Sequence, residues 1–476
     1  MGWLLWLYLS TSGGRAIKIA SQHGLGKTLW QQTWPMAIGV LALLGFQLVD
    51  SAFIARLGTA PLAAQSFTFP LSFLIIGVQV GMGIAIAALI SRTLGAGENE
   101  RAKRLGSLVL MMGSGVIALL ALLLGLFQNV IFTQLGADET TLGYINRYWW
   151  PQLLAAWLGA LLYFVYSVFR ANGDTQLPGK MMVLSSAVNL ALDPLLIFGW
   201  GPWEGLGLPG AAWATTIAFS TGLAITGRRL ILRQWLRVSG LYQEARVSSR
   251  PFMHIAGPAM IGQLMPPLAA MLAIAVVASQ GEIHVAAWGL ASRLETVSLM
   301  VILAMTMSLP PWLGRCYGAG DWGQIHRLMR LALKVAVVWQ LMLGILLALA
   351  APWVAAALTS EKAVQDALIL LIRFLLPSYA ALGICMLVVS AGNALGWPLR
   401  AMLLSAARLF ICYLPCIWLG SVLGGWSGIA MGAAVGNVLA GLTAWWVLRS
   451  ILSRPKRKPG PTSSGEYPAG EPGSPG

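Results

Sequence analysis

Two carboxylates lie in parts of the chain where a charge is costly. Asp50 is the one acid in the apolar run from Trp34 to Ala55, and Asp193 lies in a second apolar run. Both runs are long enough to cross a bilayer. A charged side chain at a membrane's centre costs at least about 2.5 kcal/mol, so an ionisable residue there is a functional-site hypothesis by default. Binding of a proton or a cation is the chemistry that such acids perform.

Polar groups surround the second acid in a helical pattern. Asn189 precedes it by one helical turn and shares its helix face. Pro194 follows it and has no backbone N–H, which leaves the carbonyl of Leu190 without its helical donor. Each acid lies about fifteen residues, or roughly 22 Å of helix, after a proline that begins its span, Pro35 or Pro178. If both spans run in the same direction, the acids lie at the same depth.

These residues predict a coupling site for a proton or a cation, made of Asp50, Asn189 and Asp193. Like charge and low dielectric both oppose two ionised carboxylates, so at least one is expected to carry a proton. Sodium at the two acids is the alternative ligand. Another interpretation is structural, because hydrogen-bonded acids can hold two helices together and Asp193 can cap a helix after a break.

Other polar residues within the apolar runs have possible supporting roles. Tyr163 and Thr215 could hydrogen-bond the acids, although polar residues also join membrane helices to one another. Pro35 is the expected bending point of the first span. Glu295, close to Arg293, is expected to form an ion pair at the membrane boundary. Arg408 is expected to extend its charge toward the membrane surface, with a substrate role as the alternative.

The composition indicates which elements position these side chains. Of the 476 residues, 57% are hydrophobic and 10% are charged, where soluble domains carry roughly 25% charged residues. Only helices satisfy every backbone group within one apolar segment, so we expect an all-α integral membrane protein. Windows of about 20 apolar residues predict twelve spans. Their centres lie near Leu44, Gly81, Ala118, Gly159, Leu190, Ile217, Leu268, Leu303, Ile345, Gly383, Ile411 and Leu439.

The net charge of +15 is explained by membrane topology and not by nucleic-acid binding. Most of the Lys and Arg residues fall in the N-terminus, in alternate loops and in the tail. This distribution follows the positive-inside rule and predicts that both termini are cytoplasmic in a multi-pass cell (inner) membrane protein. The opposite side has few basic residues: Arg56, Arg147, Arg293, Lys362 and Arg373. The lipid bilayer, and not a nucleic acid, is the expected surrounding partner.

An internal repeat divides the spans into two sets of six. A shift of 223 residues places Pro35 and Gly39 on Pro258 and Gly262, and it places the R-x-x-G-A-G motif at Arg92 on a second copy at Arg315. Because six is even, both halves enter from the same side. We therefore predict two six-helix lobes related by a pseudo-twofold axis along the membrane normal.

The repeat also predicts domain boundaries. The parts are a cytoplasmic or interfacial N-terminal segment (1–30), an N-terminal lobe with spans one to six (31–233), a cytoplasmic linker (234–252), a C-terminal lobe with spans seven to twelve (253–450) and a disordered cytoplasmic tail (451–476).

The repeat places the ion chemistry in one lobe. Asp50 aligns with Ala273, and near Pro415, the counterpart of Pro194, the second half has Tyr413 and Leu414 but no acid. The four cysteines lie at the cytoplasmic edge or within spans, so no disulfide framework is expected. Cys412 and Cys416, one helical turn apart, are interpreted as packing residues and not as metal ligands, and the four histidines are scattered, so no metal centre is expected. An enzyme is not indicated, because there is no HExxH motif and no Ser/His pairing. No cofactor is expected beyond the coupling ion.

Seven short motifs together are similar to one known family. They are T-W-P-M-A-I-G from Thr33, V-D-S-A-F-I-A-R-L-G from Val49, L-G-A-G after Arg92, A-N-G-D-T from Ala171, N-L-A-L-D-P from Asn189, G-A-A-W-A-T from Gly210 and Y-G-A-G at Tyr317. In this order and spacing they resemble the multidrug and toxic compound extrusion (MATE) family from Thr33 to Arg449. The resemblance implies two V-shaped lobes that export organic cations or hydrophobic drugs against an inward flow of protons or sodium.

Within the family, Asp50, Asn189 and Asp193 match the branch that resembles the DNA-damage-inducible protein F, whose coupling carboxylate lies in the N-terminal lobe. Thr215 would match the polar residue of span six. The sodium-coupled branch uses acids in spans seven and ten, but here 258–275 and 375–390 contain none. The resemblance therefore favours a monomeric proton-coupled multidrug antiporter that works by alternating access. Sodium coupling and a lipid-linked oligosaccharide flippase are the alternatives, although a flippase is expected to have several cavity cations and only Arg408 is a candidate.

Overall fold

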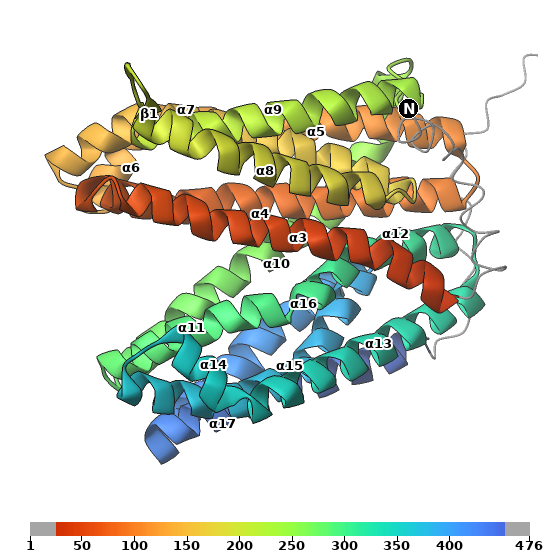
Figure 1. The fold of residues 1–476 in the computed structure, drawn as a ribbon. Helices are drawn as coiled ribbons and strands as arrows, with labels where there is room; N and C mark the ends of the chain where they lie inside the picture. Colours follow the sequence, from red (N-terminus) through yellow and green to blue (C-terminus); the bar gives the residue numbers. More distant parts are fainter. Residues whose placement is uncertain (1–24, 453–476) are drawn as a thin grey trace, which may run out of the picture.

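The computed structural model describes residues 25–452, and almost all of them are helical (Figure 1). The first half contains α3 (Leu25–Ala55), α4 (Thr59–Gly95), α5 (Asn99–Leu126), α6 (Gln128–Gln134), α7 (Glu139–Ala171), α8 (Gln176–Phe198) and α9 (Leu208–Leu232). The second half contains α10 (Leu241–Ala278), α11 (Glu282–Ser298), α12 (Met300–Gly318), α13 (Trp322–Leu349), α14 (Ala351–Leu358), α15 (Lys362–Ala394), α16 (Pro398–Ala406), the π-helix η1 (Ala407–Tyr413) and α17 (Leu414–Leu452). A two-stranded antiparallel hairpin, β1 (Gly199–Trp200) and β2 (Trp203–Glu204), joins α8 to α9.

These helices make up the twelve predicted spans. Ten helical stretches are long and apolar enough to cross a membrane, and α11 with α12 forms a further span that bends by 42°. The stretch Pro398–Ser450 holds two spans, because Gly424 and Gly425 leave the helical conformation in its middle. Gly425 has a φ of 55°, which a glycine adopts without strain. The predicted all-α membrane fold is therefore confirmed.

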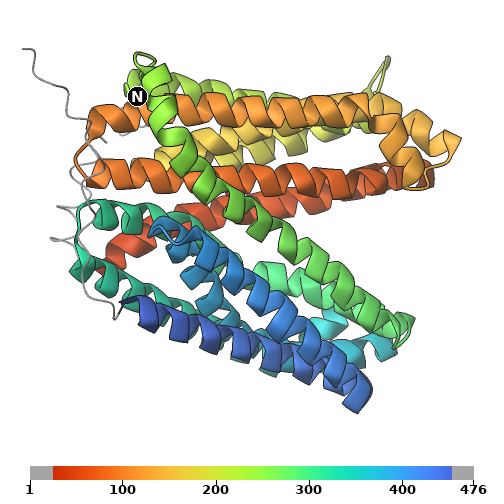
Figure 2. The same ribbon diagram turned by 180° about the vertical axis from the view of Figure 1, so that it is seen from behind.

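The two halves form two lobes that lie side by side (Figures 1 and 2). In each lobe a short helix, α6 or α14, follows the third span, so the repeat extends to the connections. Helix α10 crosses diagonally from the first lobe to the second in Figure 2, packing on α4 and α5 and then on α16 and α17. Each lobe has its own apolar core, since one cluster of buried residues runs from Ile54 to Ala256 and another from Ala273 to Leu448.

The first helix of the second half begins within the stretch that was predicted as the linker. Helix α10 begins at Leu241, inside the predicted linker, because buried Glu244 accepts a hydrogen bond from Arg101 of α5 at 3.1 Å and lies 3.5 Å from Arg104. These ion pairs hold the start of α10 against the first lobe. The described residues are helical from the first of them, Leu25, which lies before the predicted start of the N-terminal lobe. Most of the predicted N-terminal segment and of the predicted tail lie outside the described residues.

The lobes meet at one end of the bundle and diverge toward the other (Figure 1). We call the end that holds the start of α3 and the loops after α4, α7, α9, α12 and α15 the basic face. Here a Cβ added to Gly95 would lie 2.1 Å from the backbone oxygen of Arg315, and one added to Gly318 would lie 2.1 Å from that of Arg92. Only glycine permits this approach, so the two R-x-x-G-A-G motifs close the basic face against each other.

Candidate functional site

Two glycines set the register between the helices that carry the acids. Helices α3 and α8 pack along each other, and a Cβ added to Gly179 would lie 2.3 Å from the carbonyl oxygen of Pro35. One added to Gly39 would lie 3.0 Å from the oxygen of Gly179. Both helices run in the same direction from this contact, and Asp50 and Asp193 follow it by nearly equal lengths of chain, about 22 Å. The contact therefore places the two acids at one depth.

The structure brings Asp50 and Asp193 within electrostatic range of each other. The Asp193 side chain is fully buried and neither carboxylate oxygen has a hydrogen-bond partner. Asp50 is partly exposed, and its Oδ1 also lacks a partner. Within residues 25–452, no Lys, Arg or His forms an ion pair with either acid. The pair therefore needs a proton or a bound cation to be neutral, since uncompensated buried charge is costly.

Asn189 adds an acceptor to this pair. Its amide Nδ2 donates to Thr215 Oγ1 at 3.1 Å, and Thr215 donates in turn to the carbonyl oxygen of Ala211 at 3.1 Å. The amide Oδ1 of Asn189 is buried without a partner. The predicted companions Asn189 and Thr215 are thus joined. This arrangement leaves an amide oxygen without a donor one helical turn from Asp193 on α8. Carboxylate and amide oxygens suit a proton or a hard cation such as sodium.

A tyrosine that the sequence analysis missed takes the place of Tyr163. Buried Tyr148 of α7 lies within electrostatic range of Asp50 and next to Thr68 of α4. Helix α7 runs opposite to α3, so Tyr163 lies about 22 Å further from the acids along the helix axis. Its ring stacks on the guanidinium of Arg170, 5.0 Å away. Tyr163 therefore lies away from the acids in this structure, and the direction of the fourth span is the sequence signal that favours Tyr148.

Glu295 also differs from its prediction. No ion pair between Glu295 and Arg293 is found in the described part of the chain. Instead, Tyr379 of α15 donates its hydroxyl to Glu295 Oε2 at 3.0 Å. Arg408 and Tyr413 lie within electrostatic range of Glu295. The second lobe therefore has a polar cluster of its own, because the fold turns Glu295 toward α15 and away from the membrane boundary.

Two arginines cross between the lobes at the basic face. Arg92 of α4 donates to the carbonyl oxygens of Asn393 (2.6 Å) and Ala394 (2.8 Å) at the end of α15. Its repeat mate Arg315 of α12 donates to the carbonyl oxygen of Ala171 at the end of α7, at 3.1 and 2.8 Å. The last carbonyls of a helix lack helical donors and carry partial negative charge, so both contacts are favourable. We call these two contacts the arginine lock.

Helix α3 connects the acid site to the lock. Near the basic face Thr33 shares a hydrogen bond of 3.1 Å with Ser308 of α12, and Met36 packs in one cluster with Ala304. Further along the same helix, Asp50 lies in the first lobe beside α8. A rearrangement of α3 about Pro35 would therefore change contacts between the lobes.

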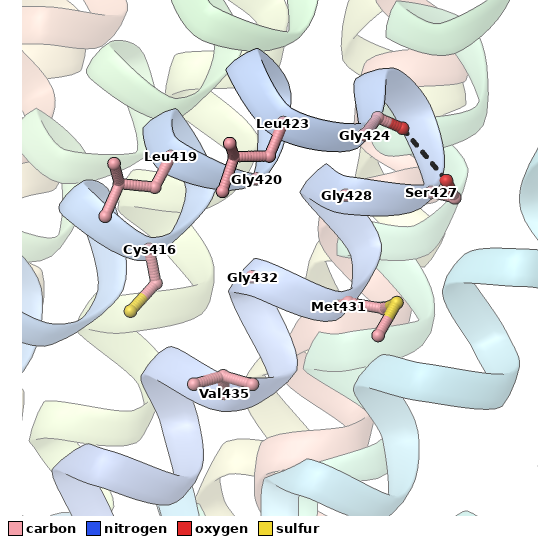
Figure 3. Close-up of a pocket in the computed structure, with 10 residues that line it drawn as sticks. All are labelled: Cys416, Leu419, Gly420, Leu423, Gly424, Ser427, Gly428, Met431, Gly432 and Val435. Carbon is pink, nitrogen blue, oxygen red and sulfur yellow. Dashed lines mark hydrogen bonds between the residues drawn. The ribbon is translucent and has the colours of Figure 1, made fainter.

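A groove of about 370 Å³ shares no lining residue with either polar cluster (Figure 3). It separates the two halves of α17 on either side of the break at Gly424, and Ser427 donates to the oxygen of Gly424 at its end. No charged side chain lines it. The lining residues are Cys416, Leu419, Gly420, Leu423, Gly424, Ser427, Gly428, Met431, Gly432 and Val435. We assign no chemistry to this groove.

We expect Gly179→Ala to destabilise the protein. The added Cβ meets backbone atoms of Pro35 that cannot move independently, and overpacking of this kind costs roughly 1–3 kcal/mol. The control is Gly45→Ala on α3, where a Cβ meets no atom within 4 Å and alanine improves helix propensity. Thermal unfolding of the purified variants checks this result. Equal stability of the two variants would contradict the proposed register contact.

Comparison with known proteins gives consistent matches along the chain. The family model MatE matches residues 35–195 and 258–419. The two segments begin 223 residues apart, which is the shift of the internal repeat. A relative described as "FAD transporter", from Shewanella oneidensis, is 34% identical over 437 residues, which cover 90% of this chain and 97% of the relative. A "Probable multidrug resistance protein YoeA" from Bacillus subtilis is 24% identical, covering 83% and 88%.

Solved structures agree with this assignment of the fold. The Vibrio cholerae MATE transporter VcmN in the bent form is 48% identical, covers 91% of this chain and 98% of its own, and has a TM-score of 0.87. An outward-facing multidrug resistance MATE family transporter of the MOP superfamily is 22% identical, covers 90% and 96%, and has a TM-score of 0.85. At that lower identity the likeness shows the fold alone.

Proposed function

Because this chain belongs to the MatE family of membrane transporters, we propose that it is an antiporter that exports small organic molecules in exchange for protons. The proposal rests on the pair Asp50 and Asp193, two acids within electrostatic range of each other that have no ion-pair partner among the described residues. A transporter that must load and release a proton needs a site whose charge changes. Organic cations and hydrophobic drugs are the proposed substrates, and relatives described as multidrug proteins support this class.

The charge distribution orients the protein. Under the positive-inside rule the basic face is cytoplasmic, so both termini lie inside and the protein belongs to the inner membrane. The described conformation is then closed toward the cytoplasm by the arginine lock. We propose that a single chain is the working unit, because each chain contains both lobes and the acid site.

The proposed cycle uses α3 as the connection between the sites. A proton that arrives from outside neutralises Asp50 and changes how α3 lies against α8. Bending about Pro35 then displaces the bound substrate outward. Loss of the proton to the cytoplasm, with opening of the lock, resets the lobes. This is alternating access between two parallel repeats.

Two alternatives involve the ion and the substrate. Sodium is supported by the partnerless oxygen of Asn189, one helical turn from Asp193, since hard cations bind oxygen ligands. The relative described as a FAD transporter supports a flavin dinucleotide as substrate, and Arg408 in the second lobe is a cation that such a phosphate-bearing molecule needs. A lipid-linked oligosaccharide flippase has less support, because a pyrophosphate carrier is expected to have several such cations.

Transport in proteoliposomes tests the coupling ion. We expect an imposed pH gradient to drive ethidium transport at equal sodium on both sides, and a proton ionophore to abolish it. A sodium gradient at uniform pH should drive none. If a sodium gradient drives transport without a pH gradient, the coupling ion is sodium and not the proton.

A further inference from the structure

Arg408 lies well inside a membrane span. It follows Pro398, where span eleven begins, by about ten residues, or roughly 15 Å of helix. Leu404 and Cys412, one turn to either side, are both buried, so this face of the span packs into the second lobe. The depth and direction argue against the predicted extension of its charge to the membrane surface. Ionisable residues at such depth mark ligand pathways.

The guanidinium of Arg408 has no hydrogen-bond acceptor anywhere in 25–452. Arg92 and Arg315, at the ends of their spans, bind backbone carbonyl oxygens instead. Arg408 is also partly exposed, so its N–H donors are accessible. A guanidinium offers five donors in a planar fork that matches a carboxylate or a phosphate. A guanidinium with unpaired donors inside a span is therefore suited to bind an anionic group of a ligand.

Glu295 is a counter-charge to Arg408 but does not bind the N–H donors of its guanidinium. Its Oε2 accepts the hydrogen bond from Tyr379, whose side chain is itself buried. Glu295 is within electrostatic range of Arg408, yet the two side chains form no ion pair within salt-bridge distance. Tyr379 thus holds the carboxylate in place. The counter-charge lowers the cost of burying Arg408 while the donors remain free.

The backbone at Arg408 is unusual as well. Arg408 and Tyr413 both belong to η1, the one π-helix among the described elements. A π-turn widens a helix and redirects its side chains, and such turns occur often at functional sites. Here the widened turn places Arg408 and Tyr413 near the same partner, Glu295. The π-helix, the carboxylate of Glu295 and the unpaired N–H donors of Arg408 therefore lie at one place in the second lobe.

We propose that Arg408 is a receptor for an anionic group, a phosphate or a carboxylate, of the transported molecule, with Glu295 and Tyr379 as the support that keeps it open. This rests on the proposed function, in that the protein transports small molecules, and it adds a substrate class. The first lobe then carries the acids that bind the proton, and the second lobe carries the cation that binds the substrate.

Riboflavin and riboflavin 5′-phosphate test the receptor, because they share a fluorescent ring and differ in one phosphate. Binding is measured on the purified full chain in nanodiscs of neutral lipid. We expect the wild type to bind the phosphate ester at least about tenfold more tightly, since a charge-assisted pair is among the stronger contacts in proteins. Arg408→Gln should remove this preference. Glu295→Gln should increase it several-fold, because the substitution removes a nearby negative charge that repels the phosphate.

Arg293→Gln is the matched control, since Arg293 is exposed on α11 and lies two residues from Glu295. It should keep the wild-type preference, and thermal unfolding should show that all variants are folded. An equal affinity of the wild type for both flavins, or a preference that survives in Arg408→Gln, would overturn the proposal. If phosphatidylglycerol in the nanodisc displaces the phosphate ester, the anion is a lipid headgroup and the substrate assignment is wrong.

Ethidium transport separates this inference from the proposed function. If the wild type fails to transport ethidium but binds riboflavin 5′-phosphate through Arg408, organic-cation export is wrong and the receptor stands. If ethidium transport is normal and the phosphate preference is absent, export stands and the receptor is wrong.

Discussion

Asp50→Asn abolishes proton-driven transport while leaving the protein folded. The substitution keeps the size and polarity of the side chain but removes the group that changes charge. Because Asp50 is the partly exposed member of the acid pair, it is the carboxylate that a proton from solution reaches. We expect the rate of pH-driven ethidium transport in proteoliposomes to fall to that of protein-free vesicles. Asp193→Asn should retain part of the activity, since it leaves the accessible acid in place.

Asp138→Asn is the control for this prediction. Asp138 precedes α7 and caps it by accepting from the backbone N–H of Thr141 at 3.1 Å. Hydrogen bonds from the Thr140 side chain and Thr141 hold the pKa of Asp138 at about 2, so it stays ionised throughout the working pH range. Asn is an equally good cap, and the variant should transport normally. Full proton-driven activity in Asp50→Asn would remove Asp50 from the coupling mechanism.

Arg92→Ala and Arg315→Ala shift the protein toward a state that is open at the basic face. Each substitution removes hydrogen bonds from a charged donor to a helix end in the other lobe. Such bonds contribute about 1.5–3 kcal/mol each, and 1.4 kcal/mol is a tenfold change in population. We therefore expect each single variant to raise the open population at least about tenfold. The double variant should exceed either single one.

The distance between spin labels reports this opening. Asn99 at the start of α5 and Arg327 on α13 are exposed positions on opposite lobes near the basic face. The fraction of long distances should rise in the lock variants. Lys103→Ala is the control, because Lys103 pairs with Glu100 of its own helix at 2.7 Å and makes no contact across the lobes. An unchanged distance distribution in the double variant would show that the glycine contacts alone close this face.

Much of the architecture was predictable because hydropathy and repeat are properties of the chain itself. Each apolar run meets the length that a bilayer requires, and the backbone has no alternative to a helix there. The motifs at Arg92 and Arg315 also identified the repeat. Their role as crossing contacts was not predictable, because the acceptors are backbone carbonyls of Ala171, Asn393 and Ala394, which no side-chain pattern reveals.

The acid site was also predictable in part and unpredictable in part. The depth of Asp50 and Asp193 followed from counting residues along helices of known rise, and the structure brings the two acids together. The hydrogen bond between Asn189 and Thr215 joins residues that the sequence had already singled out. The choice of Tyr148 over Tyr163, however, depends on which position along the axis of α7 lies at the depth of the acids on α3. Counting residues along α7 does not give that position, because it also depends on the direction of α7 and on how α7 packs against α3.

Residue patterns along the chain were enough to predict a two-lobed helical membrane protein with its membrane-embedded acids in the first lobe. Those features depend on composition, periodicity and spacing, which are local. Three other features depend on tertiary packing: Glu295 accepts from Tyr379, Arg408 has no acceptor among residues 25–452, and each motif arginine binds the opposite lobe. The physical reason is that the rotation and register of each helix are set by close contacts, such as Gly179 on Pro35, between residues far apart in the chain.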